Sequence, residues 1–124
     1  MKEIKKILYA EDEDDIRITA KMALELEAWE ILPCNSGREL LEKVSDVKPD
    51  LILLDVMMPE MDGPTTFMEL KKQPDTASIP VIFMTAKTQA KEIARYEELG
   101  AVGVITKPFD PMTLTSQIKQ LLGK

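Results

Sequence analysis

The chain has 124 residues, of which 44% are hydrophobic, and a formal net charge of -6. This length and composition predict a single domain, residues 1–124, with a core of its own, and the thinly spread Lys and Arg argue against direct binding to nucleic acid. Histidine is absent from the sequence, which excludes Ser-His-Asp and Cys-His catalysis and histidine-ligated zinc.

Cysteine content and hydropathy bear on the compartment. The single cysteine, Cys34, excludes an internal disulfide, and no apolar stretch approaches the roughly 20 residues needed to span a bilayer. No charged-then-apolar leader precedes the first apolar run. We therefore predict a cytoplasmic protein without a membrane partner.

Short apolar runs alternate with segments of helical period along the chain. The runs have the length of strands and lie at residues 7–10, 31–32, 51–54, 81–84 and 102–106. The third and fourth runs are almost wholly apolar, which is typical of parallel strands covered by helices on both faces. The predicted fold class is α/β, a doubly wound five-stranded parallel sheet with helices on both faces.

Proline in the second run indicates the strand order. Pro33 cannot donate a backbone hydrogen bond, so its strand belongs at an edge of the sheet. The expected order is 2-1-3-4-5, the order of flavodoxin-like folds. Their ligands bind beyond the carboxyl ends of the strands, between the first and third.

Several helix ends are encoded locally. The segment from Ser36 to Glu39 is a capping box, Asp110 and Pro111 suit an N-cap followed by the first helical position, and Gly100 suits a helix end. The last helix should bury one apolar stripe, formed by Leu114, Ile118, Leu121 and Leu122.

The first helix carries two apolar stripes instead of one. The first comprises Ile16, Ala20, Ala23 and Leu24, and the second comprises Ile18, Met22, Leu26 and Trp29. We favour a broad core face with Trp29 packed at the edge of the sheet. The alternative is that part of this surface docks a helix of a partner.

Charged and polar residues follow the predicted strands. Glu11 and Asp12 follow the first strand, Asp55 ends the third, Thr85 ends the fourth and Lys107 ends the fifth. In one parallel sheet these positions meet at one edge, where two like charges about 4 Å apart repel by roughly 4 kcal/mol at an effective dielectric near 20. The carboxylates must therefore take up protons or bind a cation, and a few carboxylates with water suit Mg²⁺ beside a phosphoryl group.

The acidic run at residues 11–15 has two plainer interpretations. Acids stabilise a helix N-terminus, which accounts for residues 13–15 but not for a third carboxylate converging from another strand. A calcium loop of the EF-hand type needs glycine at its sixth position, where this chain has Arg17.

Four segments resemble the receiver domains of bacterial two-component response regulators, including the single-domain chemotaxis regulator. They are ILYAEDE at 7–13, LILLDVMMPEMDG at 51–63, PVIFMTA at 80–86 and TKPF at 106–109, in the order of the family. The resemblance implies that Asp55 is the phosphoacceptor. It also implies that Glu11, Asp12, Asp55 and the backbone carbonyl of Met57 bind Mg²⁺, while Thr85 and Lys107 hold the phosphoryl oxygens.

The resemblance further implies the partners and a cis peptide bond. A sensor histidine kinase or a histidine phosphotransfer protein would supply the phosphoryl group, and a downstream protein target would bind the surface of residues 88–122. The protein would assist its own phosphotransfer without being a turnover enzyme on a small substrate. The Lys107–Pro108 bond is expected to be cis.

One departure from the family pattern concerns the response to phosphorylation. Members that switch through an aromatic side chain carry it three residues before the lysine, where this chain has Val104. A phosphorylation-independent receiver-fold interaction module is therefore the alternative function. An aspartyl-phosphate phosphatase would need an acid at Met57, and a flavin phosphate would be repelled by Glu11 and Asp12.

Overall fold

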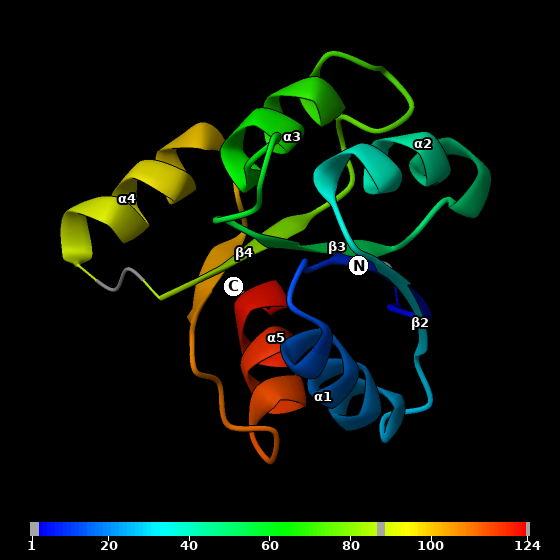
Figure 1. The fold of residues 1–124 in the computed structure, drawn as a ribbon, viewed down its shortest axis with the longest axis vertical. Helices are drawn as coiled ribbons and strands as arrows, with labels where there is room; N and C mark the ends of the chain where they lie inside the picture. Colours follow the sequence, from blue (N-terminus) through cyan, green and yellow to red (C-terminus); the bar gives the residue numbers. More distant parts are fainter. Residues whose placement is uncertain (1–2, 87–88, 124) are drawn as a thin grey trace.

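The five strands form one parallel sheet in the order β2-β1-β3-β4-β5 (Figure 1), in a computed structural model that describes residues 3–86 and 89–123. The elements are β1 (Lys6–Ala10), α1 (Asp14–Glu25), β2 (Glu30–Cys34), α2 (Gly37–Val47), β3 (Leu51–Asp55), α3 (Gly63–Lys71), β4 (Val81–Thr85), α4 (Ala90–Leu99), β5 (Gly103–Thr106) and α5 (Leu114–Leu122). The predicted fold class and strand order are confirmed, and the strand with Pro33 lies at an edge.

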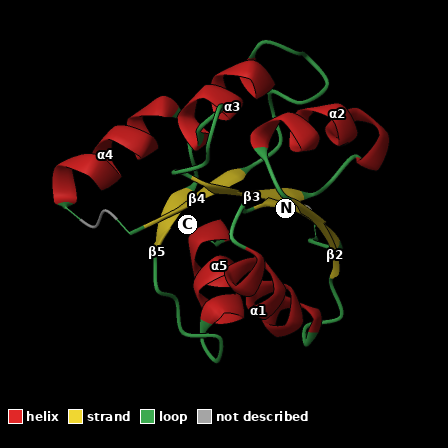
Figure 2. Cartoon of the chain, in the orientation of Figure 1, coloured by secondary structure: helices red, strands yellow, loops and turns green. Residues whose placement is uncertain are grey.

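The helices cover both faces of the sheet. Helices α2, α3 and α4 lie on one face, and α1 and α5 lie on the other (Figure 2). All five residues of β3 and of β4 are buried, which is why their sequences read as unbroken apolar runs. The centre of the sheet is therefore a rigid base for the side chains that follow its strands.

The apolar residues divide into two cores by alternation along each strand. In β1, Leu8 and Ala10 face α2 and α3, whereas Ile7 and Tyr9 face α1 and α5. In β3, Leu53 belongs to the α1 and α5 side, so Asp55, two residues further on, belongs to that side as well. The alternation thus determines the face on which the first charged side chains emerge.

Two of the predicted helix ends are confirmed, with one change of partner. The Ser36 hydroxyl accepts a hydrogen bond from the Glu39 N–H at 3.0 Å, as a capping box requires. The Glu39 carboxylate accepts from the Asn35 N–H at 2.6 Å, one residue earlier than the motif predicts. Gly100 ends α4 with φ of 117°, a conformation that favours glycine.

The predicted start of the last helix was wrong. Asp110 does not cap α5, which begins at Leu114 after Thr113. The Asp110 carboxylate accepts from the Met112 N–H at 2.9 Å, and its carbonyl accepts from the Thr113 N–H at 3.0 Å. The side chain that suits a cap thus closes a separate turn, and the helix begins only after that turn.

The favoured interpretation of α1 was also wrong for its second stripe. Ile18, Met22 and Leu26 are 53%, 66% and 83% exposed, so they are not part of a broad core face. Trp29 does pack against the core on the α1 and α5 side, as expected. Docking of a partner helix on this exposed stripe, the alternative interpretation, stays a prediction.

Within residues 3–86 and 89–123, none of the helices combines the length and the apolar character required to cross a bilayer. The predicted output surface, residues 88–122, includes Thr88, which lies outside the described residues.

Candidate functional site

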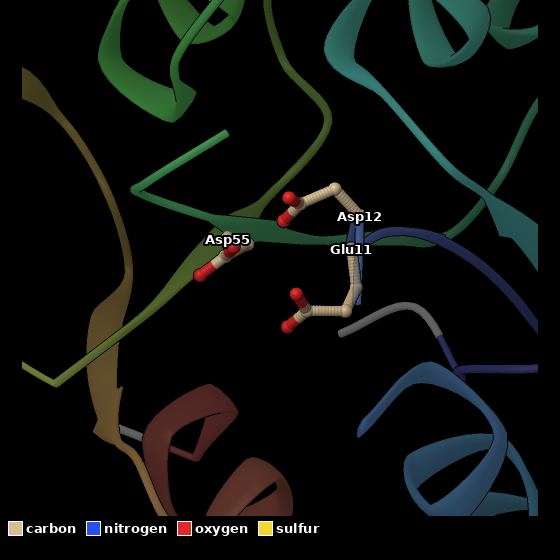
Figure 3. A group of neighbouring side chains, drawn as sticks. All are labelled: Glu11, Asp12 and Asp55. Carbon is tan, nitrogen blue, oxygen red and sulfur yellow. The ribbon is translucent and has the colours of Figure 1, made fainter. Parts of the chain in front are cut away.

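Three carboxylates meet at the carboxyl ends of β1 and β3. Glu11, Asp12 and Asp55 each offer one oxygen, and these three oxygens lie within 4.8 Å of one another. In Figure 3 the Glu11 side chain extends toward α1 and α5, the Asp12 side chain extends toward α2 and α3, and Asp55 lies beside both. The convergence of acids predicted from the strand ends is therefore present in the structure.

Lys107 joins two of these acids. Its Nζ donates to Glu11 Oε1 at 2.9 Å and to Asp55 Oδ1 at 3.0 Å, across 96 and 52 residues of sequence. The Lys107–Pro108 peptide bond is cis, as expected. Because Glu11 is fully buried and Asp55 is only 2% exposed, water does little to screen their charges, and the Lys107 ammonium offsets them.

The electrostatic environment favours the protonated form of Asp55. Burial raises the pKa of this carboxyl from an ordinary 3.8 to about 7, and the neighbouring charge of Glu11 adds to the effect. The hydrogen bond and charge of Lys107 act in the opposite direction without cancelling it. Burial would by itself lower the pKa of Lys107, but its bonds to Glu11 and Asp55 outweigh this, and the pKa is raised.

The second oxygen of Asp55 has a different environment from the first. Asp55 Oδ2 is buried and has no hydrogen-bond partner among the residues that the structure describes. A buried carboxylate oxygen without a partner carries a desolvation cost, so a native structure that retains one usually has a functional reason. Lys107 fixes one oxygen of Asp55 while the other remains able to react or to bind.

The donor set fits a divalent cation of the Mg²⁺ type. When all four groups are ionised, one ammonium leaves two of the three carboxylate charges uncompensated. Carboxylate oxygens are ligands that Mg²⁺ prefers, and the unpartnered Asp55 Oδ2 is among the atoms it could contact. Met57 follows Asp55 by two residues, and its carbonyl stays a predicted ligand.

Thr85 lies on the strand next to that of Asp55. It ends β4 and is buried, and its carbonyl accepts from the Lys107 N–H at 2.8 Å. Asp55 is paired in the sheet with Met84, the residue before Thr85. The fold thus places Thr85 at the same edge as the carboxylates, whereas its predicted contact with a phosphoryl group stays a prediction.

A cavity of about 530 Å³ opens beside Asp55 and Lys107. Its walls come from α1 and from the segment after β5, including Ile16, Thr19 and Phe109. Its volume is within the range of small-molecule sites, and its lining is largely apolar. A group that reacts with Asp55 therefore has a route of approach between α1 and the loop that follows Lys107.

Sequence reasoning missed Arg17 as a support of the site. Its Nη1 donates to the Glu11 carbonyl at 2.8 Å, while Nη2 pairs with Asp14. The Glu13 N–H also donates to Glu11 Oε2 at 3.2 Å. The sequence does place Arg17 three residues after Asp14, a spacing at which two side chains meet on one face of a helix. This spacing predicts the pair of Arg17 with Asp14, but it does not predict that the guanidinium also contacts Glu11.

The backbone at Asp55 is held by a close approach of α3. A Cβ added to Gly63 would lie 2.5 Å from the Asp55 carbonyl oxygen and 2.9 Å from the Val56 Cα. The Gly63 N–H donates to the Val56 carbonyl at 2.9 Å. Only a residue without a side chain fits here, because the nearest atoms are backbone.

Gly63→Ala is expected to lower the free energy of unfolding by about 1–3 kcal/mol, the usual cost of overpacking. The matched control is Gly123→Ala, because a Cβ there would meet its nearest atom at 3.4 Å, an ordinary contact. Urea unfolding of both variants measures the difference. Equal stability of the two variants would contradict a tight contact between α3 and the Asp55 backbone.

Comparison with known proteins gives consistent matches over almost the whole chain. Residues 7–119 match the family model described as response regulator receiver domain. Among curated proteins, the alkaline phosphatase synthesis transcriptional regulatory protein PhoP of Bacillus subtilis is 36% identical over 97% of this chain and 49% of its own length. The phosphate regulon transcriptional regulatory protein PhoB of Pseudomonas aeruginosa is 38% identical over 97% of this chain and 52% of its own length.

Solved structures show the same fold at similar coverage. The chemotaxis protein CheY4 of Vibrio cholerae has a TM-score of 0.88 and 28% identity, over 96% of this chain and 99% of that one. The signal receiver domain of a histidine kinase from Syntrophus aciditrophicus has a TM-score of 0.82 and 39% identity, over 96% and 90%. The chain thus spans about half of the two curated relatives but nearly all of these two structures.

Proposed function

The chain belongs to the family of response regulator receiver domains of two-component signalling, and from that premise we propose that Asp55 accepts a phosphoryl group from a phosphohistidine of a partner protein. The observation that carries this proposal is the asymmetry of the Asp55 carboxyl group. Lys107 holds Oδ1 at 3.0 Å, and Oδ2 is buried without a partner in the described part of the chain. Such an arrangement orients one oxygen as a nucleophile.

In the proposed reaction the Asp55 oxygen forms a bond to phosphorus while the bond between phosphorus and the donor imidazole nitrogen breaks. The electron pair of the broken bond stays on that nitrogen. Lys107, already within hydrogen-bonding distance of Asp55, stabilises the negative charge on the phosphoryl oxygens. Thr85, at the end of the adjacent strand, is the proposed hydroxyl donor to the same oxygens.

Glu11, Asp12 and Asp55 are the proposed side-chain ligands of Mg²⁺, with the carbonyl of Met57. A bound Mg²⁺ supplies positive charge that favours the ionised form of Asp55 and offsets the charge of the phosphoryl group. These residues therefore position the acceptor, while the ammonium of Lys107 remains available to the transferred group.

The proposed donor is a sensor histidine kinase or a histidine phosphotransfer protein. The volume of the cavity beside Asp55, about 530 Å³, exceeds that of an imidazole ring, and its largely apolar walls suit such a ring. The exposed stripe is formed by Ile18 and Met22 of α1 and by Leu26, the residue that follows this helix. Because α1 also lines the cavity, the stripe is a candidate contact for the donor protein. Because Asp55 is itself modified, the chain acts as a signalling carrier and not as a turnover enzyme.

The proposed output is a contact with a downstream protein. PhoP and PhoB are named as transcriptional regulatory proteins, and this chain spans about half of each. We propose that the residues of this chain act through protein contacts and do not bind nucleic acid themselves, since their net charge is -6.

The proposed function is tested by incubating the protein with phosphoramidate and Mg²⁺, followed by intact mass. Wild type should gain one phosphoryl group that hydroxylamine removes, because an acyl phosphate reacts with this nucleophile. Asp55→Asn should gain none, since a carboxamide is a poor nucleophile. Asp46→Asn, which changes an exposed acid of α2, should label like wild type.

Three results would count against the proposal. Unlabelled wild type would remove the basis for a phosphorylated switch and favour an interaction module that acts without phosphorylation. Equal labelling of Asp55→Asn would mean that another residue is the acceptor. Labelling that is unchanged by chelation of Mg²⁺ would contradict the role given to Glu11 and Asp12.

A further inference from the structure

Tyr9 is a buried residue whose polar atom has no evident use in the fold. The side chain is fully buried in the core between the sheet and helices α1 and α5. Its hydroxyl makes no hydrogen bond to any residue of the described ranges 3–86 and 89–123. Phenylalanine would fill the same space without the cost of desolvating a hydroxyl, so the tyrosine requires an explanation outside packing.

Tyr9 lies one layer before the carboxylates on the same face of the sheet. It precedes Glu11 by two residues on β1, and its partner in the sheet is Leu53, which precedes Asp55 by two residues on β3. Side chains two residues apart on a strand lie on the same face. Tyr9 and Leu53 therefore form the layer beneath Glu11 and Asp55, on the side facing α1 and α5.

The charged residues of the site affect the pKa of the Tyr9 hydroxyl. Burial raises the pKa of Tyr9, and the carboxylates of Glu11 and Asp55 raise it further, while Arg17 acts in the opposite direction. A phenol hydroxyl is a hydrogen-bond donor, and the carboxylates of Glu11 and Asp55, in the next layer of the same face, are acceptors. An orphaned donor under an acidic cluster is a second observation that points into the same site as the unpartnered Asp55 Oδ2.

We propose that Tyr9 is a positioning residue of the cation site, whose hydroxyl donates a hydrogen bond, directly or through one bound water, to the Glu11 carboxylate when that carboxylate holds a divalent cation. In the present structure the Glu11 oxygens accept from Lys107 and from the Glu13 N–H. A cation competes with Lys107 for Glu11. The phenol then supplies an alternative donor that orients the carboxylate toward the cation.

The length of Glu11 makes such an orienting contact useful. Glutamate has three side-chain torsions, and fixing them costs conformational entropy that the free energy of a second hydrogen bond offsets. Groups behind the ligands that orient a metal-binding side chain commonly change affinity by 10- to 100-fold when removed. Tyr9 would have this role for Glu11, as Lys107 has for Asp55.

The proposal rests on the Mg²⁺ site of the proposed function, and it is tested by calorimetric titration with Mg²⁺ of wild type, Tyr9→Phe, Glu11→Gln and the double variant. Tyr9→Phe should raise the Kd for Mg²⁺ about tenfold, which corresponds to about 1.4 kcal/mol. The double variant should bind no more weakly than Glu11→Gln alone, because the two residues act through one carboxylate. Tyr96→Phe, which removes a phenol on the other face of the sheet, should leave the Kd unchanged.

Thermal unfolding without divalent cations separates positioning from packing. Tyr9→Phe should unfold at the same temperature as wild type or higher, because it removes an unpartnered buried hydroxyl. Higher stability of the cation-free protein together with weaker Mg²⁺ binding is an outcome that a purely structural role does not give.

The possible results distinguish this proposal from the proposed function. If wild type binds Mg²⁺ and Tyr9→Phe binds it equally well, the role of Tyr9 is refuted while the cation site stands. An equal loss of affinity in the Glu11→Gln background would show that Tyr9 does not act through Glu11. If wild type binds no Mg²⁺ at millimolar concentration, both the cation site and the role of Tyr9 are overturned.

Discussion

The unfolding free energy of the cation-free protein should fall by up to about 4 kcal/mol between pH 4 and pH 7 as Asp55 titrates beside Glu11 and Lys107. Burial raises the pKa of this carboxyl from 3.8 to about 7 in the folded protein. Each unit of difference between the folded and unfolded pKa is worth about 1.4 kcal/mol. Asp55 is 2% exposed, so solvent does little to screen this effect.

The sign of this change in stability depends on whether the folded or the unfolded protein binds the Asp55 proton more tightly. Between pH 4 and pH 7 the folded protein retains the Asp55 proton and the unfolded chain has lost it, so stability decreases as pH rises. Above pH 7 Asp55 is ionised in both the folded and the unfolded state, and its contribution to stability no longer changes with pH. Below pH 4 both states are protonated, and the stabilisation due to the raised pKa is fully present.

The measurement compares urea unfolding of wild type and Asp55→Asn from pH 4 to pH 8 in the presence of a chelator. Other groups, such as Glu39, whose pKa is lowered by its hydrogen bond from the Asn35 backbone, are common to both proteins, so the difference isolates Asp55. Asp55→Asn should be the more stable protein at pH 8. The raised pKa of Asp55 would be refuted if the unfolding free energies of the two proteins changed in parallel with pH, or if wild type were the more stable protein at pH 8.

Lys107→Met should lower the unfolding free energy by about 3–5 kcal/mol at pH 8 without divalent cations, the usual cost of removing one partner from a buried ion pair. Methionine retains most of the apolar stem of the lysine. It removes the ammonium that contacts both Glu11 and Asp55, which are almost completely buried. The loss should be smaller at pH 5, because Asp55 can then escape the repulsion by taking up a proton.

The control for this prediction is Lys72→Met, which breaks an exposed pair with Glu69 and should cost less than about 1 kcal/mol. Addition of millimolar Mg²⁺ should stabilise Lys107→Met more than wild type, since a bound cation replaces the missing positive charge. Losses of similar size in the two variants, with no effect of Mg²⁺, would mean that Lys107 is not the counter-ion of the carboxylates.

Much of the fold could be predicted because the decisive signals are local. The unbroken apolar runs that became β3 and β4 indicate strands covered on both faces, and Pro33 identifies one edge. Once the strand order is known, the positions of Glu11, Asp55 and Lys107 at strand ends bring them to one edge of the sheet. The pairing of residues up to 96 positions apart therefore follows from topology and not from sequence spacing.

The features that were not predicted depend on competition between neighbours. Asp110 suits a helix cap, but its carboxylate accepts a hydrogen bond from the Met112 N–H in a turn that precedes the helix. Ile18, Met22 and Leu26 suit a core face, but no element among the described residues covers them. The partner of a side chain, such as that of Arg17, is determined by which atoms the completed fold brings within reach.

The position of β5 has a further consequence for the site. This strand has four residues and, among the residues that the structure describes, pairs with β4 alone, whereas β1 and β3 are each paired on both sides. Edge segments open to solvent more readily than central ones, at a cost below that of global unfolding. An opening of β5 would withdraw Lys107 and leave Glu11 and Asp55 without this counter-ion, so the contact of the ammonium with the two carboxylates depends on β5 remaining in the sheet.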